Sequence, residues 1–560
     1  MFRWILAVAC IQVLVSSVAF GQTSPPLWSK CFGGGDSPVY PSSVAVDDSG
    51  NVLVTGWFSG TVDLGGGLLV GEGLEDIFIG KFGPSGNHIW SQRFGGFYTT
   101  PDGDQRGEGI TVDISGNVIA TGRFRGTADF GGGPLTSAGA QDIFVAKFDA
   151  AGNHLWSKRF GDGAQEAGEG VVVDASGNVV VTGYFHSTVD FGGGTLTSAG
   201  STDIFLAKFD SAGNHLWSKR FGDVDTQYPT SAAIDGSGNV ILTGELSGTV
   251  DFGGGTLTSA GSSDIFVAKF EASGNHFWSK RFGDGQWQIG NSVTADASGN
   301  VVVTGRFKDT VDFGGGPLTA AGPTLNATDD IFVAKFDPNG NHLWSKRFGD
   351  DHNQCGSSVA VDGSGNVIVT GWFDGWVDFG GWAYATTGSW DIFVAKFDPN
   401  GDHLESQRFG DWNRQQALAV AADESGNVIL TGSFEGAVDF GEGPLTCGPG
   451  GFAVKLADIE TGISTIRTGD TPRVGAYPNP LNAQTTIRYS IPATGMVNLG
   501  VYDVNGRLVR VLVNEQEPAG DHAVTWDGRD DTSGFAASGV YFCRLEAGGV
   551  MQTKKLVLLK

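Results

Sequence analysis

Short runs of alternating apolar and polar residues follow one another through most of the chain, and each run has the length of a β-strand. Between 169 and 222 the runs are Val171–Asp174, Val179–Phe185, Asp203–Asp210 and His215–Phe221. The sequences ASGN and SAGN, which separate the first pair and the last pair of runs, are typical of tight turns. A Gly-rich excursion joins the two pairs. The pattern therefore predicts two antiparallel hairpins that form one four-stranded sheet.

This pattern recurs with a period of roughly sixty residues, and such a period determines the architecture. The first hairpin turn ends on Asn51, Asn117, Asn178, Asn239, Asn300, Asn366 and Asn427. The motif WSKRFG, or a close variant, begins at Trp28, Trp90, Trp156, Trp217, Trp278 and Trp344, and a further copy, ESQRFG, begins at Glu405. Repeated units of four antiparallel strands predict an all-β fold, a seven-bladed β-propeller over residues 22–456.

The first and last repeats are incomplete in complementary ways. The chain begins with an outer strand at 27–33, and the repeats stop after a third strand at 452–456. We therefore expect the N-terminal strand to complete the seventh blade and close the ring, because closure removes open sheet edges. Cys31 and Cys447 flank this junction. A disulfide between them requires Cα atoms within about 7 Å, and we expect Cys355 and Cys543 to be unpaired.

The segments outside the repeats predict export and a second domain. Residues 1–21 combine Arg3, an apolar run from Trp4 to about Val18 and small residues, which indicates a signal peptide. No later stretch is apolar enough for a transmembrane span. Residues 457–474 lose the repeat, and we interpret them as a linker. Over 475–560, alternating apolar residues and short turns predict a small Ig-like β-sandwich.

Charge narrows the choice of partners. The chain of 560 residues carries a net charge of -26. Such a surface repels phosphate backbones and anionic lipids, which argues against nucleic acid and membrane surfaces as partners. We interpret the charge as a source of solubility outside the cell, and we expect a monomer.

Two family resemblances rest on these motifs. The repeats carry a DxxGNVxVTG hairpin and a DxFVAKxDxxG strand, and over about 27–456 the chain resembles the bacterial seven-bladed-propeller repeat family. A GTVDFGGG excursion stands where that family more usually has DFP. The resemblance implies the fold and is almost silent on function.

The C-terminal domain resembles the Ig-like sorting domain of type IX secretion cargo, akin to the Ig-like domain of the flagellar hook-capping protein. The matching residues include Pro478, Asn479, Pro480, Gly539, Tyr541, Lys554, Lys555 and Lys560. The resemblance implies passage through the inner membrane on the signal peptide and through the outer membrane on this domain, with the secretion machinery as partner. A plain Ig-like stability module is the alternative.

Two sets of chemistry-bearing residues recur once per blade. The histidines are His88, His154, His215, His276, His342 and His403, and the loop aspartates are Asp63, Asp129, Asp190, Asp251, Asp312, Asp378 and Asp439. Counterparts in neighbouring blades are expected roughly 15–20 Å apart, which is too far to share one metal ion. We therefore expect no metal site and no cofactor, with calcium in each blade as a minor alternative.

The residues that break the repeat are the candidates for ligand binding. They concentrate in the loops that lead from each outer strand to the next blade, which in propellers gather on one face around the channel. Aromatic surfaces beside acids suit sugars or peptides, so the expected ligand is an extracellular glycan or protein. The candidates are Tyr98, Asp102, Asp104, Glu166, Asp225, Tyr228, Trp287, Trp412 and Arg414. The alternative is that these are ordinary surface residues of the loops and bind no ligand.

No catalytic motif stands out from the repeats: the chain has no GxSxG elbow, no phosphate-binding Gly loop and no HExxH. We therefore predict a non-enzymatic binding or scaffold protein that is secreted or lies on the outer cell surface. The alternative is an extracellular hydrolase or lyase acting on polysaccharide or peptide. Two carboxylates, or a His–acid pair, at the channel mouth would favour that alternative.

Overall fold

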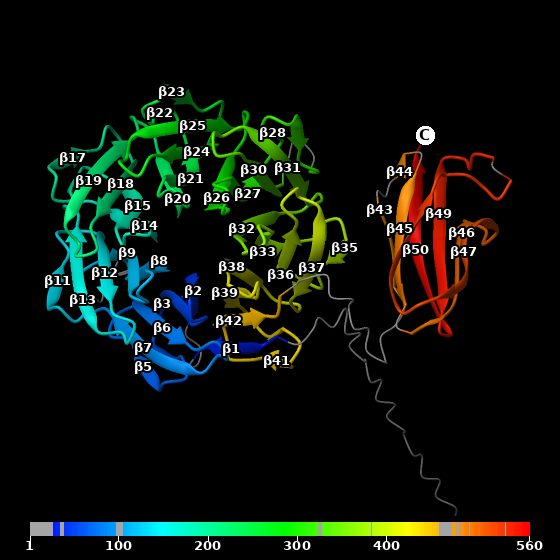
Figure 1. Ribbon diagram of the computed structural model, residues 1–560, viewed down its shortest axis with the longest axis horizontal. Helices are drawn as coiled ribbons and strands as arrows, with labels where there is room; N and C mark the ends of the chain where they lie inside the picture. Colours follow the sequence, from blue (N-terminus) through cyan, green and yellow to red (C-terminus); the bar gives the residue numbers. More distant parts are fainter. Residues whose placement is uncertain are drawn as a thin grey trace, which may run out of the picture.

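Seven four-stranded antiparallel sheets surround a central axis in the computed structural model (Figure 1). The structure describes residues 26–33, 38–96, 105–322, 328–381, 383–458, 473–477, 481–482, 484–491, 493–532 and 534–559. Every regular element in these ranges is a β-strand, so the predicted all-β propeller fold is confirmed. In the same ranges no helix of the length and apolarity needed to cross a membrane is found.

The four strands of a blade follow one another from the channel to the circumference. The inner strands are β2 (Val39–Val46), β8 (Arg106–Val112), β14 (Glu166–Val173), β20 (Gln227–Ile234), β26 (Gln288–Ala295), β32 (Gln354–Val361) and β38 (Gln415–Ala422). The second strands are β3 (Val52–Phe58), β9 (Val118–Phe124), β15 (Val179–Phe185), β21 (Val240–Leu246), β27 (Val301–Phe307), β33 (Val367–Phe373) and β39 (Val428–Phe434).

The outer half of each blade is the hairpin that was most uniform in the sequence. The third strands are β6 (Asp76–Phe82), β12 (Asp142–Phe148), β18 (Asp203–Phe209), β24 (Asp264–Phe270), β30 (Asp330–Phe336), β36 (Asp391–Phe397) and β42 (Gly450–Leu456). The outer strands are β7 (His88–Phe94), β13 (His154–Phe160), β19 (His215–Phe221), β25 (His276–Phe282), β31 (His342–Phe348), β37 (His403–Phe409) and β1 (Trp28–Phe32).

The VTG motif of the second strands follows from close packing inside a blade. In the third blade Gly183 lies so close to the Ala167 carbonyl that any Cβ would clash, and the other second-strand glycines meet the same obstacle. The inner strand bulges at this point, between Gly168 and Gly170. The preceding Thr182 is fully buried and donates a 2.9 Å hydrogen bond to the Phe205 carbonyl of the third strand.

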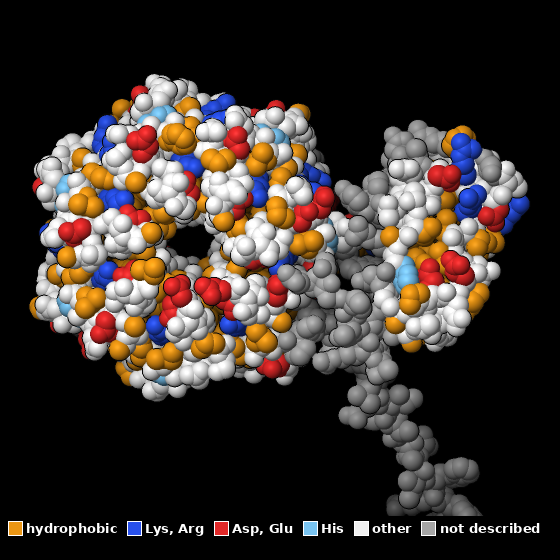
Figure 2. All heavy atoms as spheres, viewed as in Figure 1, with side chains coloured by type: hydrophobic (Ala, Val, Ile, Leu, Met, Phe, Trp, Pro, Cys, Tyr) orange, Lys and Arg blue, Asp and Glu red, His pale blue; other side chains and the backbone are white. Residues whose placement is uncertain are grey.

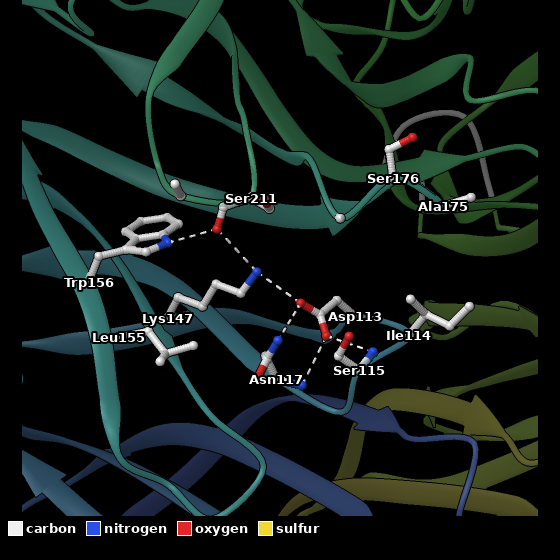
Figure 3. Close-up of a pocket in the computed structure, with 12 residues that line it drawn as sticks. Asp113, Ile114, Ser115, Asn117, Lys147, Leu155, Trp156, Ala175, Ser176 and Ser211 are labelled. Atoms are coloured by element: carbon white, nitrogen blue, oxygen red, sulfur yellow. Dashed lines mark hydrogen bonds and ion pairs between the residues drawn. The ribbon is translucent and has the colours of Figure 1, made fainter.

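An Asp–Lys ion pair is buried in every blade, and in the first six blades the lysine also binds a group in or just beyond the next blade. In the second blade Lys147 of the third strand lies 2.8 Å from Asp113 of the first turn, and both side chains are buried (Figure 3). Lys147 Nζ also donates to the Ser211 carbonyl of the third blade at 3.4 Å, and Trp156 Nε1 donates to the same oxygen at 3.1 Å. The conserved spacing of Asp, Lys and Trp in the repeats therefore joins neighbouring blades.

The seventh blade contains both ends of the propeller. Strand β1 pairs antiparallel with β42, from Trp28 opposite Lys455 to Phe32 opposite Gly451, so the prediction that the N-terminal strand completes this blade is confirmed. Trp28 donates to the Pro84 carbonyl of the first blade at 3.0 Å, as the other outer-strand tryptophans do to their neighbours. One core cluster combines residues of the first and seventh blades.

In the seventh blade a disulfide takes the place of an Arg–Asp ion pair that joins the outer and third strands of the other blades. In the other six blades an outer-strand Arg binds the first Asp of the third strand, as Arg281 binds Asp264. Cys31 stands at the Arg position and Gly450 at the Asp position. Cys31 and Cys447, the pair proposed from the sequence, form a disulfide with Cα atoms 6.2 Å apart. Cys355 and Cys543 are free and buried.

The sixth blade departs from the repeat where its neighbour lacks an outer hairpin. The outer strand of the seventh blade comes from the N-terminus, so β42 and β1 are not joined by a hairpin turn whose carbonyl could accept a Trp N–H. Glu405 accordingly stands at the Trp position. Lys396, whose counterparts bind turn carbonyls, pairs instead with Asp458, just beyond the seventh blade.

The C-terminal domain is a small Ig-like β-sandwich of two sheets, as predicted. One sheet has the order β43 (Arg473–Tyr477), β45 (Thr485–Ile491) and β48 (Gly520–Trp526). The other has the order β44 (Leu481–Asn482), β50 (Val550–Leu559), β49 (Gly539–Ala547), β46 (Gly495–Asp503) and β47 (Leu508–Glu517). Tyr489, Trp526 and Cys543 are at the centre of their common core. The predicted signal peptide and most of the predicted linker lie outside the described residues.

Candidate functional site

The side chains that vary between blades gather on one side of the propeller. On this side the inner strands begin, the second strands end, and the loops between blades cross; we call it the loop face. The ring surrounds a central opening (Figure 2). The residue that follows VTG or its equivalent on the second strand varies strongly between blades. Its occupants are Trp57, Arg123, Tyr184, Glu245, Arg306, Trp372 and Ser433.

Stacked aromatic rings form the loop face of the sixth and first blades. The rings of Trp372 and Trp390 are stacked with centroids 4.0 Å apart, and the Arg414 guanidinium lies 4.6 Å from the Trp390 centroid. In the first blade Tyr40 stacks on Trp57 at 4.3 Å. These planar surfaces are fixed by packing before any ligand arrives.

Arginines and acids fill the spaces between these aromatic groups. Arg106 lies 4.5 Å from the Trp57 centroid and binds both carboxylate oxygens of Glu75, at 2.6 and 2.8 Å. Trp287 donates from Nε1 to Glu245 at 2.8 Å, and Arg306 lies 4.5 Å from the Trp287 centroid. The face therefore combines apolar planes with strong hydrogen-bonding groups.

Two glutamates meet across the boundary of the second and third blades. Glu108 and Glu169 are the bulge residues of β8 and β14, and both contact Arg123, at 3.3 and 3.8 Å. Burial and the negative charge of Glu108 raise the pKa of Glu169, against the opposing influence of Arg123 and Arg106. A carboxylic acid beside a carboxylate is an arrangement that acid–base chemistry uses.

The same bulge position serves a structural purpose in other blades. There the side chain donates a hydrogen bond to a carbonyl of the next inner strand. The donors are Ser42, Thr230 and Asn291, which bind the carbonyls of Gly107, Gly290 and Gly356. An ionised carboxylate cannot donate such a bond. The two glutamates are therefore a real departure from the repeat at the channel.

Glu166, a candidate from the sequence, lies beneath the loop face and is fully buried. Glutamine occupies this position in five other blades, at Gln105, Gln227, Gln288, Gln354 and Gln415. In the fourth blade the Gln227 amide donates to the Ser247 carbonyl at 2.7 Å, and its oxygen accepts from the Asp223 N–H at 3.1 Å.

The carboxyl of Glu166 replaces that amide in a buried environment. Burial, followed by the negative charges of Asp162 and Asp142, raises the pKa of Glu166 to about 9. The Oε1 atom has no hydrogen-bond partner among the described residues. Glu166 is thus neutral at physiological pH, and no surface ligand reaches its buried carboxyl.

The other predicted residues are distributed over the loop face. Tyr228 packs edge-on against Tyr184, with centroids 4.9 Å apart. Trp412 is 79% exposed, and Arg414 is exposed above Trp390. Asp225 is exposed and belongs to none of the aromatic clusters. Tyr98, Asp102 and Asp104 lie outside the described residues.

The structure adds residues to the loop face that do not lie in the loops between blades. Trp57, Arg123, Trp372 and Trp390 lie within or beside strands and not in the inter-blade loops. Their signal was nonetheless present in the sequence. In an alignment of the repeats, the position after VTG varies although the Gly before it is constant, and the position before DIF varies although DIF is constant in six blades.

The repeated histidines and aspartates have structural partners. His215 Nε2 lies 3.1 Å from the Ser218 hydroxyl, and Asp190 Oδ1 accepts hydrogen bonds from Gly192 and Gly194 at 2.7 and 3.1 Å. The other blades repeat these contacts at most positions. Within the described ranges one group of potential metal ligands is close together, Asp350, Asp351 and His352, and it is largely exposed.

A hollow of about 480 Å³ lies on the side opposite the loop face, between the second and third blades (Figure 3). It is lined by the Asp113–Lys147 ion pair, by Trp156 and by the exposed side chains of Ile114 and Leu155. Its polar groups already bind one another. The hollow is therefore a by-product of the repeated contacts between blades.

The residues proposed for sorting are divided between the sandwich and the undescribed segments. Tyr541 donates to the Ala537 carbonyl at 2.7 Å and packs against Trp526. Gly539 begins β49, and Lys554 and Lys555 lie on the neighbouring β50. Pro478, Asn479, Pro480 and Lys560 lie outside the described residues.

Comparison with family models supports both parts of the fold. A β-propeller repeat family model matches residues 27–57, and a FlgD Ig-like domain model matches residues 482–549. Both matches are local, and together they cover the ends of the described chain.

Known proteins with similar sequences are much longer than this chain. An uncharacterized WD repeat-containing protein, L264, from Acanthamoeba polyphaga mimivirus is 23% identical over 502 residues, which is 70% of this chain and 35% of the relative. The regulatory protein FlaEY of Caulobacter vibrioides is 28% identical over 178 residues, 30% of this chain and 18% of the relative. The chain thus spans about a third or less of these relatives.

Among solved structures, the β-propeller domain of the Trilobed protease from Pyrococcus furiosus is similar. The alignment covers 73% of this chain and 95% of that domain, with 7% identity and a TM-score of 0.36. Taken together, the repeat match, the Ig-like match and the sheet topology describe a β-propeller repeat protein with a C-terminal Ig-like domain.

Proposed function

We propose that this β-propeller is a non-enzymatic binding or scaffold protein that acts outside the cell and recognises a glycan or protein with its loop face. One observation carries the proposal: the variable side chains of the blades gather on this face, while the repeated polar groups elsewhere are paired with one another. Aromatic planes bordered by arginines and acids suit such ligands.

Binding is tested with an array of glycans and extracellular proteins probed with the mature full-length protein. A loop-face variant, Trp57→Ala with Trp390→Ala, is compared with a control variant, Leu155→Ala with Leu216→Ala. The two control residues are exposed on the outer strands β13 and β19. We expect the loop-face variant alone to lose binding by about tenfold or more. Equal loss in both variants, or binding that survives in the loop-face variant, would contradict the proposal.

We further propose export by the signal peptide and a type IX-like role for the C-terminal domain. The Cys31–Cys447 disulfide supports an oxidising destination outside the cytoplasm. Deletion of residues 475–560 in the native host is expected to trap the protein in the periplasm, where immunoblotting of cell fractions detects it. Continued appearance of the deletion variant in the medium would refute the sorting role.

The acid pair favours a second candidate function, an extracellular hydrolase or lyase. Glu108 and Glu169 provide the two carboxylates at the channel that such chemistry requires, with the pKa of Glu169 raised. Release of reducing ends or amines from a panel of polysaccharides and peptides, lost in both Glu108→Gln and Glu169→Gln, would replace the binding-only proposal. Absence of turnover on a ligand that is bound at the loop face would remove the enzyme alternative.

A further inference from the structure

The sixth blade concentrates tryptophan as no other blade does. Five of the 15 tryptophans fall within forty-one residues: Trp372, Trp376, Trp382, Trp390 and Trp412. None of them belongs to the repeated WSKRFG motif. Three, Trp372, Trp390 and Trp412, occupy loop-face positions at which other blades carry mostly smaller or charged residues.

The loop that leads to the seventh blade carries Trp412, and it runs beside the segment that carries Trp390. The Thr387 hydroxyl donates to the Asp411 carbonyl at 2.9 Å, and the Gln415 N–H donates to the Trp390 carbonyl at 2.9 Å. Residues 411–415 therefore run alongside 387–390. Trp412, on this loop, is 79% exposed, and Trp390 is half-buried on its stacked partner. We call Trp390, Trp412 and Arg414 the tryptophan platform.

Arg414 differs from the other arginines of the loop face in its partners. Arg106, Arg123 and Arg306 each lie within ion-pair distance of an acid: Glu75, Glu108 and Asp329. Arg414 is exposed, lies over Trp390, and forms no ion pair with any described residue. Its planar fork of N–H donors is therefore available, above the Trp390 ring, for one carboxylate.

We propose that the tryptophan platform binds an acidic polysaccharide in which uronic acids alternate with uncharged sugars. A sugar ring face stacks on the exposed Trp412, and one uronate carboxylate binds Arg414, which lies over Trp390, in a bidentate manner. The net charge of -26 opposes densely charged polyanions, so the fit is to one carboxylate among neutral units. This inference rests on the proposed binding function and names its ligand class.

Calorimetric titration of the mature full-length protein tests the ligand class with three probes: hyaluronan, carboxyl-reduced hyaluronan and polygalacturonate. We expect hyaluronan to bind about tenfold or more tightly than its carboxyl-reduced form, since a charge-assisted pair is lost in the latter. Polygalacturonate should bind more weakly than hyaluronan at low salt. Stronger binding of polygalacturonate, or equal binding of the first two probes, would overturn the proposal.

Variants locate the site. Arg414→Gln should reduce binding of hyaluronan to the level of the carboxyl-reduced form, and Trp412→Ala should weaken binding of both. Trp287→Ala is the matched control, because Trp287 also stacks with an arginine on the loop face but that arginine pairs with Asp329. Loss of binding in the control alone would refute the platform. Binding of a protein ligand at the loop face, with no affinity for any polysaccharide, would sink this inference and leave the proposed function standing.

Discussion

At the scale of single residues, one amide-to-carboxyl replacement changes how a blade responds to pH. Five blades place a Gln amide between two loop groups, and the third blade places the Glu166 carboxyl there. A carboxyl can take over the donor role of the amide only when it carries a proton. Its raised pKa, about 9, is the consequence of burial and of the nearby Asp162 and Asp142.

Glu166→Gln is predicted to stabilise the protein, and more so at higher pH. A folded-state pKa above the unfolded one gives stability that is fully present below about pH 4.5 and is lost as pH rises toward 9. The gain should be on the order of 3 kcal/mol at pH 7 and should disappear near pH 4. Urea unfolding at both pH values measures it. The reverse change, Gln227→Glu, should destabilise with the same pH trend, and a pH-independent effect of either variant would contradict the explanation.

The buried Asp–Lys pairs are a second determinant at this scale. Lys208 lies 2.8 Å from Asp174 and donates to the Ala272 carbonyl of the next blade at 3.2 Å. Burial alone raises the pKa of Asp174, but hydrogen bonds from Lys208 and Asn178 outweigh it and lower the pKa overall. Each pair therefore contributes stability that is present above about pH 4 and lost as pH falls.

Lys208→Met is predicted to cost about 3–5 kcal/mol at pH 7, because it leaves a buried carboxylate without its cation. The deficit relative to the natural protein should narrow as pH falls below about 4. Lys219→Met, on the outer strand of the same blade, is the control, since no ion pair of Lys219 appears in the described part of the chain. Denaturant titration at two pH values measures the free energy of unfolding of both variants. It decides whether stability depends on the Asp–Lys pair or on any lysine of the blade.

At the scale of elements, β1 is the one outer strand that is not held by a hairpin. The others follow their third strand directly after a short turn, whereas β1 and β42 are more than four hundred residues apart in the chain. The Cys31–Cys447 bond supplies the missing connection at the position where other blades use an Arg–Asp pair. The strand is therefore held by a covalent bond where local chain connectivity is lacking.

Cys31→Ser is predicted to lower the free energy of unfolding by about 2–5 kcal/mol and to expose β1 to proteases. Guanidinium unfolding and limited proteolysis, with the N-terminal fragment identified by mass spectrometry, measure both effects. Reduction of the natural protein should reproduce them, while Cys355→Ser should not destabilise in this way. Detection of both thiols as free in the native, non-reduced protein would remove the basis of the prediction.

The strands were predictable from the sequence, and much of the loop face was not. The repeats reveal the periodicity of the strands, the residues of the turns and the split seventh blade, because all seven blades must satisfy the same packing. The sequence does not indicate Trp57 and Trp390, because neither lies in a loop between blades. Their contacts with arginines of the next blade are set by the tertiary structure. The sequence predicts Glu166 as a surface residue because a carboxylate is rarely buried. The comparison with Gln at its counterparts would have indicated otherwise.

At the scale of the whole molecule, the propeller and the sandwich have separate cores. None of the clusters of buried apolar residues in the described ranges mixes residues of the blades with residues of the C-terminal domain. Two units without a shared core are expected to unfold independently.

Calorimetry of the mature protein should therefore show two transitions. A variant ending at residue 458 is expected to retain the propeller transition within about 2 °C, since it removes no contact from a propeller core. The isolated C-terminal domain should reproduce the remaining transition. A single transition that shifts by many degrees on truncation would indicate a shared interface and contradict this independence.

The central place of β42 in the seventh blade also has a mechanical consequence. When a pull exerted through the C-terminal domain runs along β42, it acts on a strand that lies between β39 and β1. Both hydrogen-bonded ladders would then be loaded in shear, so that many bonds share the force instead of opening one after another. The disulfide joins the segment just before β42 to β1, and it limits how far the chain can extend under tension. A protein held through its C-terminal domain while its loop face binds a ligand would thus carry the load through the blade that contains the disulfide.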